Sequence, residues 1–305
     1  MEPVITPNSP EASAPAHQGK RRGTSPWAIG MHKFTKNKLA IASIIFLAVI
    51  FLICFSADFL THYDPIKIDI RNINQAPSSE HWLGTDKGGR DVYTRLLYGG
   101  QISLTIGLSI TLFVVIFGTL IGSVAGYFGG LVDNLLMRFT DFIITFPFLI
   151  FVIVLNSVFT ASGVLTLITV VSVLSWGSTA RMVRGKILAE KENEYVHSAI
   201  SIGCTPAQVI IKHILPNVIS TIIVQGVYLL ASMIVVETGL SFLGFGVPSN
   251  VPSWGNIMSD AVSPEVIEQQ WWIWLPAGAC ITLTILAINF VGEGLKDAFN
   301  PKSLR

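Results

Sequence analysis

Long apolar runs without a charged side chain alternate with polar segments along most of this chain. A helix needs about 20 apolar residues to cross a bilayer core. Four runs meet that length and predict spans at 39–57, 102–125, 218–236 and 272–291. A fifth run, 142–180, would be about 58 Å long as one helix, nearly twice the bilayer core, so we expect it to fold back. Small and polar residues at 156–163 predict the turn, and the pattern as a whole predicts an all-α polytopic membrane protein with six transmembrane helices.

Composition supports the same class. Of the 305 residues, 51% are hydrophobic and 13% are charged, whereas soluble domains carry about 25% charged residues. The lipid bilayer is therefore an expected partner, and a net charge of +1 predicts no general attraction to nucleic acid. Cys54, Cys204 and Cys280 are far apart in the sequence and indicate neither a disulfide framework nor a metal site. The sequence motifs GxxxxGK[ST], HExxH and GxSxG do not occur, so we expect no catalytic residues and no enzyme activity in this chain.

The distribution of Lys and Arg predicts the orientation. With the N-terminus inside, 15 of the 20 Lys and Arg residues lie in inner segments and 5 lie in outer segments. Inner segments of membrane proteins are enriched in these cations. We therefore expect a multi-pass protein of the cell (inner, cytoplasmic) membrane with both termini in the cytoplasm. The tail 1–38 is rich in Pro and Ser and then basic, which predicts disorder followed by a basic segment, without a cleaved signal peptide.

One amphipathic segment, 194–217, lies between the fourth and fifth predicted spans. Apolar positions of its first half recur at helical spacing: Val196, Ala199, Ile200 and Gly203. We expect Gly203 to end a first short helix and Thr205 with Pro206 to begin a second, which runs to Pro216. Two short helices joined at a glycine form a compact knob suited to docking a partner. An ordinary cytoplasmic loop with surface helices is the alternative interpretation.

This segment resembles the EAA loop of the membrane subunits of ABC importers. In that loop an acidic residue, two alanines, a glycine and a distal Leu-Pro form a coupling helix that fits a cleft in an ATPase subunit. The coupling residues that the resemblance implies are Glu194, His197, Ser198, Ala199, Gly203, Leu215 and Pro216. His197 and Ser198 stand where the acidic residue and the first alanine are usual, and Glu194 could supply the acid one turn earlier. Gly203 would be required for a positive φ or a close backbone approach.

Further segments are similar to the C-type permease subunit of the peptide and nickel group of ABC importers: 81–104, 126–147, 237–246, 252–258 and 292–302. The resemblance implies a type I ABC importer permease fold. A first helix at 39–57 and an extracytoplasmic loop at 58–101 would precede a transmembrane domain at 102–294. That domain would hold five helices and the EAA loop at 181–217, with a cytoplasmic tail at 295–305.

The resemblance also implies the partners. They would be a homologous second permease subunit, two cytoplasmic ATPase subunits and an extracytoplasmic peptide-binding protein. ATP and Mg²⁺ would be used by the ATPases, and this chain would bind no cofactor. The chain would form half of a translocation pathway for peptides. A nickel importer of the same group is one alternative, and a membrane scaffold without a transport role is another.

Four residues are candidates for a structural or gating role: Asp141, Pro147, Glu237 and Gly244. Glu237 is the clearest charge inside a predicted span, and such a group marks a functional site or hydrogen-bonds a neighbouring helix end. The outer loop 58–101 is a candidate contact for the binding protein, or a lid on the bundle. Within it, residues 91–97 predict a short interfacial helix whose charged side chains face water.

Overall fold

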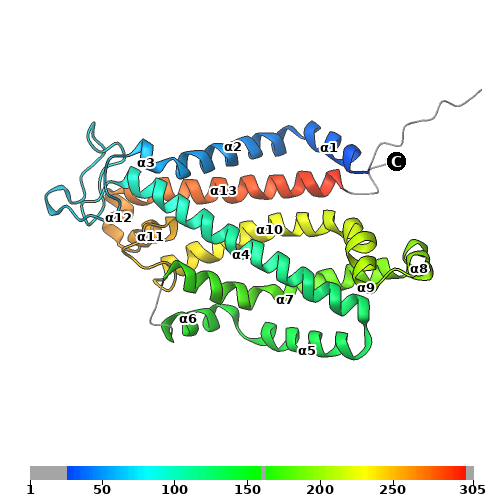
Figure 1. The fold of residues 1–305 in the computed structure, drawn as a ribbon. Coiled ribbons are helices and arrows are strands. Elements are labelled where there is room, and N and C mark those ends of the chain that lie inside the picture. The colour runs from blue at the N-terminus through cyan, green and yellow to red at the C-terminus, as the bar shows by residue number, and fades with distance from the viewer. Residues whose placement is uncertain (1–25, 159–162, 300–305) are drawn as a thin grey trace, which may run out of the picture.

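The computed structural model describes residues 26–158 and 163–299, and its regular elements there are helices (Figure 1). Within these two ranges β-pairing is limited to one isolated bridge between Thr85 and Asp91. The helices long and apolar enough to span a membrane are α2 (Lys38–Phe55), α4 (Val92–Phe128), α7 (Val164–Lys191), α10 (Leu215–Phe242) and α13 (Trp271–Ala298). A sixth span is the broken pair α5 (Gly130–Thr145) and α6 (Phe148–Val158), bent by 82°. The predicted all-α, six-span architecture is confirmed.

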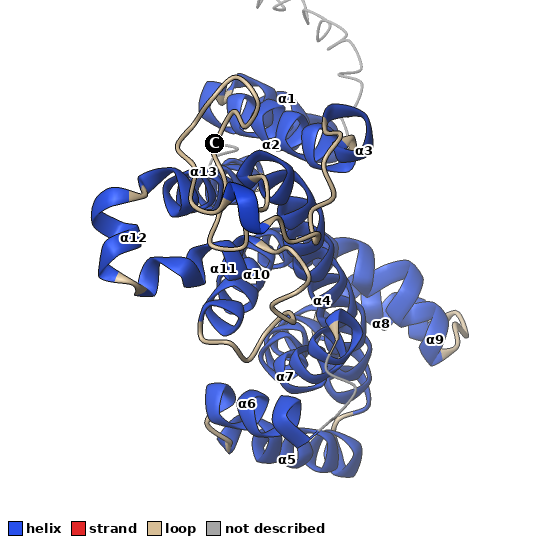
Figure 2. Cartoon of the chain, turned by 90° about the vertical axis from the view of Figure 1, so that its left-hand side faces the viewer, coloured by secondary structure: helices blue, strands red, loops and turns tan. Residues whose placement is uncertain are grey.

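Helix α4 runs diagonally through the bundle (Figures 1 and 2). The pair α2 and α13 lies on one side of it, while α7, with α5 and α6 beyond it, lies on the other. Helix α1 (Pro26–Lys36) packs on α13, so the described chain begins and ends at the same end of the bundle. The short elements at the opposite end are α3 (Ala57–Leu60), η1 (Ile70–Asn72), α11 (Trp254–Met258), η3 (Ser259–Val262) and α12 (Pro264–Gln269).

Helix α4 begins earlier than its apolar run. It starts at Val92 because Asp91 caps it, accepting a hydrogen bond from the Thr94 amide at 2.7 Å. The predicted interfacial helix with water-facing charges is therefore wrong: residues 92–97 form the first turns of a span. Arg95 is 3% exposed and pairs with Asp86, and this pairing lets a charged residue enter the buried start of the helix.

Glycines at every fourth position bring α4 close to α7. A Cβ added to Gly118 would lie 2.8 Å from the Cβ of Thr179, and one added to Gly122 would lie 2.9 Å from the Cβ of Val183. Small residues at this spacing allow two membrane helices to approach closely. These glycines therefore allow α4 to pack closely against α7, the helix that leads out of the membrane toward residues 194–217.

The fold-back predicted at 156–163 separates α6 from α7. Helix α6 ends at Val158 and α7 begins at Val164, while Thr160 and Ser162 lie outside the described residues. A further break, at Phe146 and Pro147, was not predicted.

Candidate functional site

The segment 194–217 forms a knob that projects from the end of the bundle where α1 and the end of α13 lie (Figure 1). Its first helix, α8 (Glu194–Ser201), ends as the sequence predicts. Gly203 has a φ of +89°. Its backbone N–H donates a hydrogen bond to Ile200 O at 3.0 Å, and the N–H of Cys204 donates one to Ala199 O at 3.1 Å. This is the Schellman arrangement, which favours glycine at the left-handed position. A Cβ on Gly203 would meet no described atom within 4 Å, so its φ, and not crowding within the chain, requires glycine here.

The second helix also begins as predicted. Thr205 Oγ1 accepts from the Gln208 amide at 3.4 Å, and Gln208 Oε1 accepts from the Thr205 amide at 2.9 Å, which makes a capping box around Pro206.

The predicted end of that helix at Pro216 is wrong. Helix α9 (Pro206–Gln208) passes through a π-helical turn, η2 (Val209–Ile214), directly into α10. The Leu215 amide donates to Ile210 O, five residues back. A π turn widens the helix locally, and we infer that it accommodates the ring and the missing donor of Pro216 without a break.

Buried apolar side chains join the knob to two spans. Val196 is fully buried and Ala199 is 3% exposed on the inner side of α8. Their cluster includes residues of α7, of η2 and of α10: Val183, Ile187, Val209, Ile214, Val218 and Ile222. Because interiors of this kind resist deformation, a displacement of α8 would move α7 and α10 with it.

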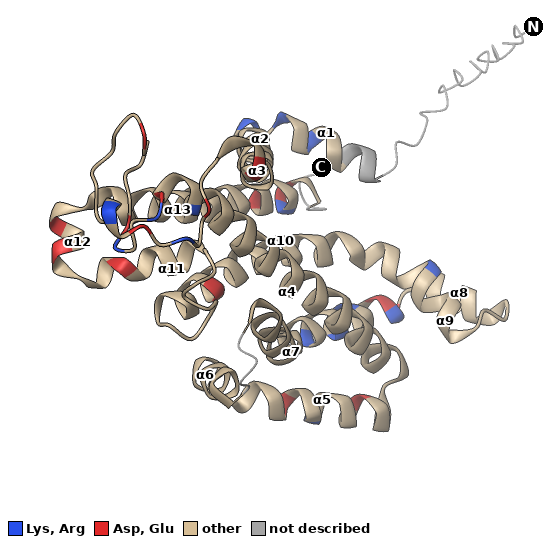
Figure 3. Ribbon diagram, turned by 60° about the vertical axis from the view of Figure 1, so that its left-hand side comes forward, with Lys and Arg blue, Asp and Glu red and all other residues tan. Residues whose placement is uncertain are grey.

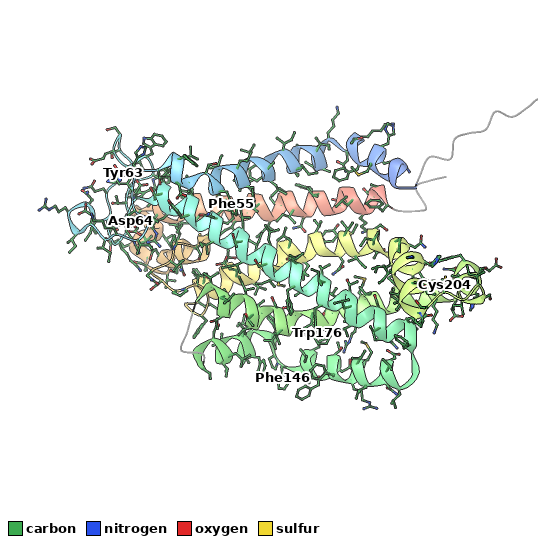
Figure 4. All side chains as sticks on the ribbon, viewed as in Figure 1. Phe55, Tyr63, Asp64, Phe146, Trp176 and Cys204 are labelled. Carbon is green, nitrogen blue, oxygen red and sulfur yellow. The ribbon has the colours of Figure 1, made fainter. Side chains whose placement is uncertain are left out.

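The outer surface of the knob carries polar and apolar groups together. Of the seven coupling residues named from the sequence, Ala199 is buried and Leu215 half-buried, and the exposed ones are Glu194, His197, Ser198, Gly203 and Pro216. Three isoleucines are also exposed: Ile200 (45%), which the sequence grouped with the apolar positions of the first helix, and Ile202 (79%) and Ile211 (62%), which were not predicted. Cys204 lies in the same projecting part (Figure 4). Isoleucines among polar groups outside the spans form a surface suited to contact a protein.

Two ion pairs connect α5 to α7, the helix that carries the knob. Figure 3 shows the acidic positions on α5. Arg184 donates to both carboxylate oxygens of Asp133, from Nε to Oδ1 and from Nη2 to Oδ2 at 2.5 Å. Arg181 pairs with Asp141, one of the gating candidates. These pairs were not predicted, because both aspartates lie in the segment between the predicted second and third spans and both arginines lie in the EAA loop predicted at 181–217. The pairs provide a polar connection between the outermost helix and α7.

We expect Asp133→Ala to lower the free energy of unfolding by about 1–2 kcal/mol, because it leaves a half-buried guanidinium without its two-point partner. Thermal unfolding of the purified protein in detergent measures this change. Asp141→Ala, which breaks an exposed pair, is the matched control and should change stability by less than about 1 kcal/mol. The exchange of Asp133 and Arg184 should restore part of the loss, and equal losses in both alanine variants would contradict the assignment.

The other three gating candidates lie toward the opposite end. Pro147 follows the break between α5 and α6. Glu237 is fully buried, accepts from Ser241 Oγ at 2.9 Å, and lies beside the hydroxyls of Ser103 on α4 and Ser253 at the start of α11. It thus has hydrogen-bonding groups of two neighbouring helices around it. Gly244 ends α10 with a φ of +82° in a second Schellman arrangement.

Known proteins resemble the chain over nearly its whole length. A family model described as "binding-protein-dependent transport system inner membrane component" matches residues 118–305. A second, described as "N-terminal TM domain of oligopeptide transport permease C", matches residues 25–77. The oligopeptide transport system permease protein OppC of Escherichia coli is 39% identical over 282 residues, 92% of each chain. The dipeptide transport system permease protein DppC of Bacillus subtilis is 36% identical over 296 residues, 97% of this chain and 92% of that one. The chain therefore belongs to the family of binding-protein-dependent transport system inner membrane components.

Proposed function

We propose that this chain is a permease subunit of an ATP-driven peptide importer and forms half of its translocation pathway. The observation that carries the proposal is the knob, which is packed firmly between two spans and exposes isoleucines outside the bundle. Relatives named as oligopeptide and dipeptide permeases support peptides as the substrate class. ATP and Mg²⁺ would be bound by two separate ATPase subunits. A homologous permease subunit and an extracytoplasmic binding protein would complete the complex.

The geometry gives the coupling a mechanical route. An ATPase that binds the knob and moves on closing would displace α8, and the buried cluster would transmit that displacement to α7 and α10. Helix α5 would follow α7 through Asp133 and Arg184. Spans that move together in this way can exchange inward- and outward-facing states.

Polar groups at membrane depth indicate which face borders the pathway. Helix α2 exposes apolar side chains along its length, as expected of a lipid contact. Helices α5, α7 and α10 also expose apolar side chains, but each exposes a polar one as well: Asp141, Ser178 and Gln225. A cavity of about 320 Å³ opens on this side, and its lining combines aromatic rings, among them Phe146 (Figure 4), with Ser178 and Gln225. Exposed polar groups in spans mark a water-filled path or a partner, so we place the pathway and the second permease subunit here.

The knob is expected to face the cytoplasm, because most Lys and Arg residues of the described chain lie at its end of the bundle. We expect a cysteine introduced at Ser198 to react with a membrane-impermeant maleimide only when the inner face of the membrane is accessible. Inside-out and right-side-out vesicles of a variant that lacks the three native cysteines measure this directly. A cysteine in the 58–101 loop, at the exposed Ser79, is the control and should react from the other face. Reaction of Ser198→Cys from outside would contradict the proposal.

Uptake by a strain deleted for this chain, with and without a plasmid copy, tests the function itself. We expect the plasmid to restore ATP-dependent import of labelled tripeptides and not of nickel. Restoration of nickel import alone would indicate a metal importer. If import of neither depends on the chain, a scaffold role replaces the proposed one.

A further inference from the structure

A cationic cavity lies at the outer end of the chain, on the opposite side of the membrane from the knob. It has a volume of about 360 Å³ and joins the 58–101 loop to the segment between α10 and η3. Its charged lining residues are three cations and one acid: Lys87, Arg90, Arg95 and Asp260. Ile66, Ile68 and Asn250 also line it. Charged residues gather at this end of the molecule (Figure 3).

The cavity has more cationic side chains than carboxylates paired with them. Asp86 is buried, and its carboxylate serves both guanidiniums, accepting from Arg90 Nε at 2.9 Å and from Arg95 Nη1. Its other oxygen accepts backbone amides of the same turn. Asp260 pairs with Lys87 at 2.7 Å. Three cations therefore share two carboxylates, and one positive charge remains for a ligand.

The deepest cation of this group also has an unused donor. Arg95 is 3% exposed, and among the described residues its Nε has no hydrogen-bond partner. A buried guanidinium donor without an acceptor is costly unless an acceptor arrives from outside. A carboxylate is the anion whose planar pair of oxygens matches guanidinium donors.

A second cavity borders the first. It holds about 460 Å³ and shares Ser249, Asn256 and Ser259 with the cationic cavity. Uncharged residues form its described lining, among them Asn156 and Ser157 of α6. The loop between the cavities is held in place by Asn256, whose Nδ2 donates to the carbonyls of Val247, Pro248 and Val251 at 3.0–3.1 Å. A cationic cavity beside a neutral polar one suits a peptide, with its carboxylate in the first and its backbone amides in the second.

We propose that the cationic cavity binds the C-terminal carboxylate of a peptide as it enters the pathway. This inference rests on the proposed peptide-import function. Arg90 is the residue to test, because its side chain is 12% exposed, whereas that of Arg95 is 4% exposed and belongs to the start of α4. Arg90→Gln retains donors for Asp86 but removes the charge. Arg90→Lys retains the charge, and Arg71→Gln removes an exposed cation of the same loop that does not line the cavity.

Uptake of labelled Ala-Ala-Ala and of its C-terminal amide by cells carrying each variant gives the readout. The ratio of acid to amide uptake, relative to wild type, cancels any preference of the binding protein. For Arg90→Gln we expect this ratio to fall about fivefold, equivalent to about 1 kcal/mol. Arg90→Lys should recover most of it, and Arg71→Gln should leave it at the wild-type value. An immunoblot of the membrane fraction corrects for abundance.

If the binding protein rejects the amide, uptake cannot compare the two peptides, and their direct binding to the transporter is measured. Saturation-transfer NMR on the complete transporter in lipid nanodiscs, without the binding protein, should show the acid bound better than the amide by wild type and not by Arg90→Gln. Equal losses for both peptides would overturn the inference and indicate a structural role or protein docking, as would an unchanged ratio. If wild-type cells import neither peptide, the proposed function itself fails.

Discussion

Gly203→Val is expected to reduce peptide uptake about tenfold or more while the complex still assembles and hydrolyses ATP. The reason is conformational. Gly203 has a φ of +89°, and a β-branched residue in the left-handed region costs about 2 kcal/mol, a factor of roughly 30 against the native turn. The knob would then lose the fixed geometry between α8 and α9, and motion of an ATPase would no longer reach the spans.

Transport and ATP hydrolysis should be measured on the same proteoliposomes, so that loss of coupling is separated from loss of assembly. Gly203→Asn is the matched control, because asparagine tolerates the left-handed region and nothing in the chain crowds its Cβ. It should retain most of the uptake. If asparagine impairs uptake as strongly as valine, glycine is required at position 203 by contact with the docked ATPase and not by the conformation of the turn. Wild-type uptake by the valine variant would contradict the coupling role.

The sequence predicts most of the fold because its main signals are local. A charge-free run of about 20 residues is sufficient for a span, and five of the six predicted spans lie on long helices, while the third crosses the break between α5 and α6. The turn at Gly203 and the cap at Thr205 depend on neighbours within a few residues, and both are present. These features need no knowledge of the tertiary structure.

The missed features depend on contacts between distant segments. The start of α4 could not be placed from hydropathy, because Arg95 becomes acceptable in a buried position only through Asp86 in the preceding loop. The continuation of α9 into α10 depends on a π turn, for which Pro216 alone indicates the opposite. The exposed isoleucines of the knob, Ile202 and Ile211, lie among polar residues, so a search for long apolar runs does not detect them.

The coupling surface and the outer cavity differ in how far apart in the sequence their residues lie. The knob needs only two adjacent turns, so the resemblance of its sequence to a known loop was informative. The cationic cavity combines residues from the 58–101 loop with residues after α10, nearly 160 positions apart, as the bond from Trp254 Nε1 to Leu96 O also does. Only the folded chain brings these groups together.

Asp86→Asn should be the most destabilising conservative change in the outer region. Both carboxylate oxygens are occupied, and the variant would leave two guanidiniums, one of them buried, without a counter-charge. Breaking a buried ion pair from one side costs about 3–5 kcal/mol. We therefore expect a large fall in the thermal unfolding midpoint of the purified complex. The exposed Glu80, changed to Gln, is the matched control and should have little effect.

A second variant distinguishes an uncompensated charge from general damage to the turn. If the cost of Asp86→Asn comes from the buried charge of Arg95, then adding Arg95→Met should recover part of the lost stability, because the apolar side chain removes that charge while filling similar space. Additive losses in the double variant would contradict this cause and would assign the effect to the backbone amides of Gly88 and Arg90 that Asp86 also holds. Recovery would establish that Asp86 is required chiefly because it permits Arg95 at the start of a membrane span.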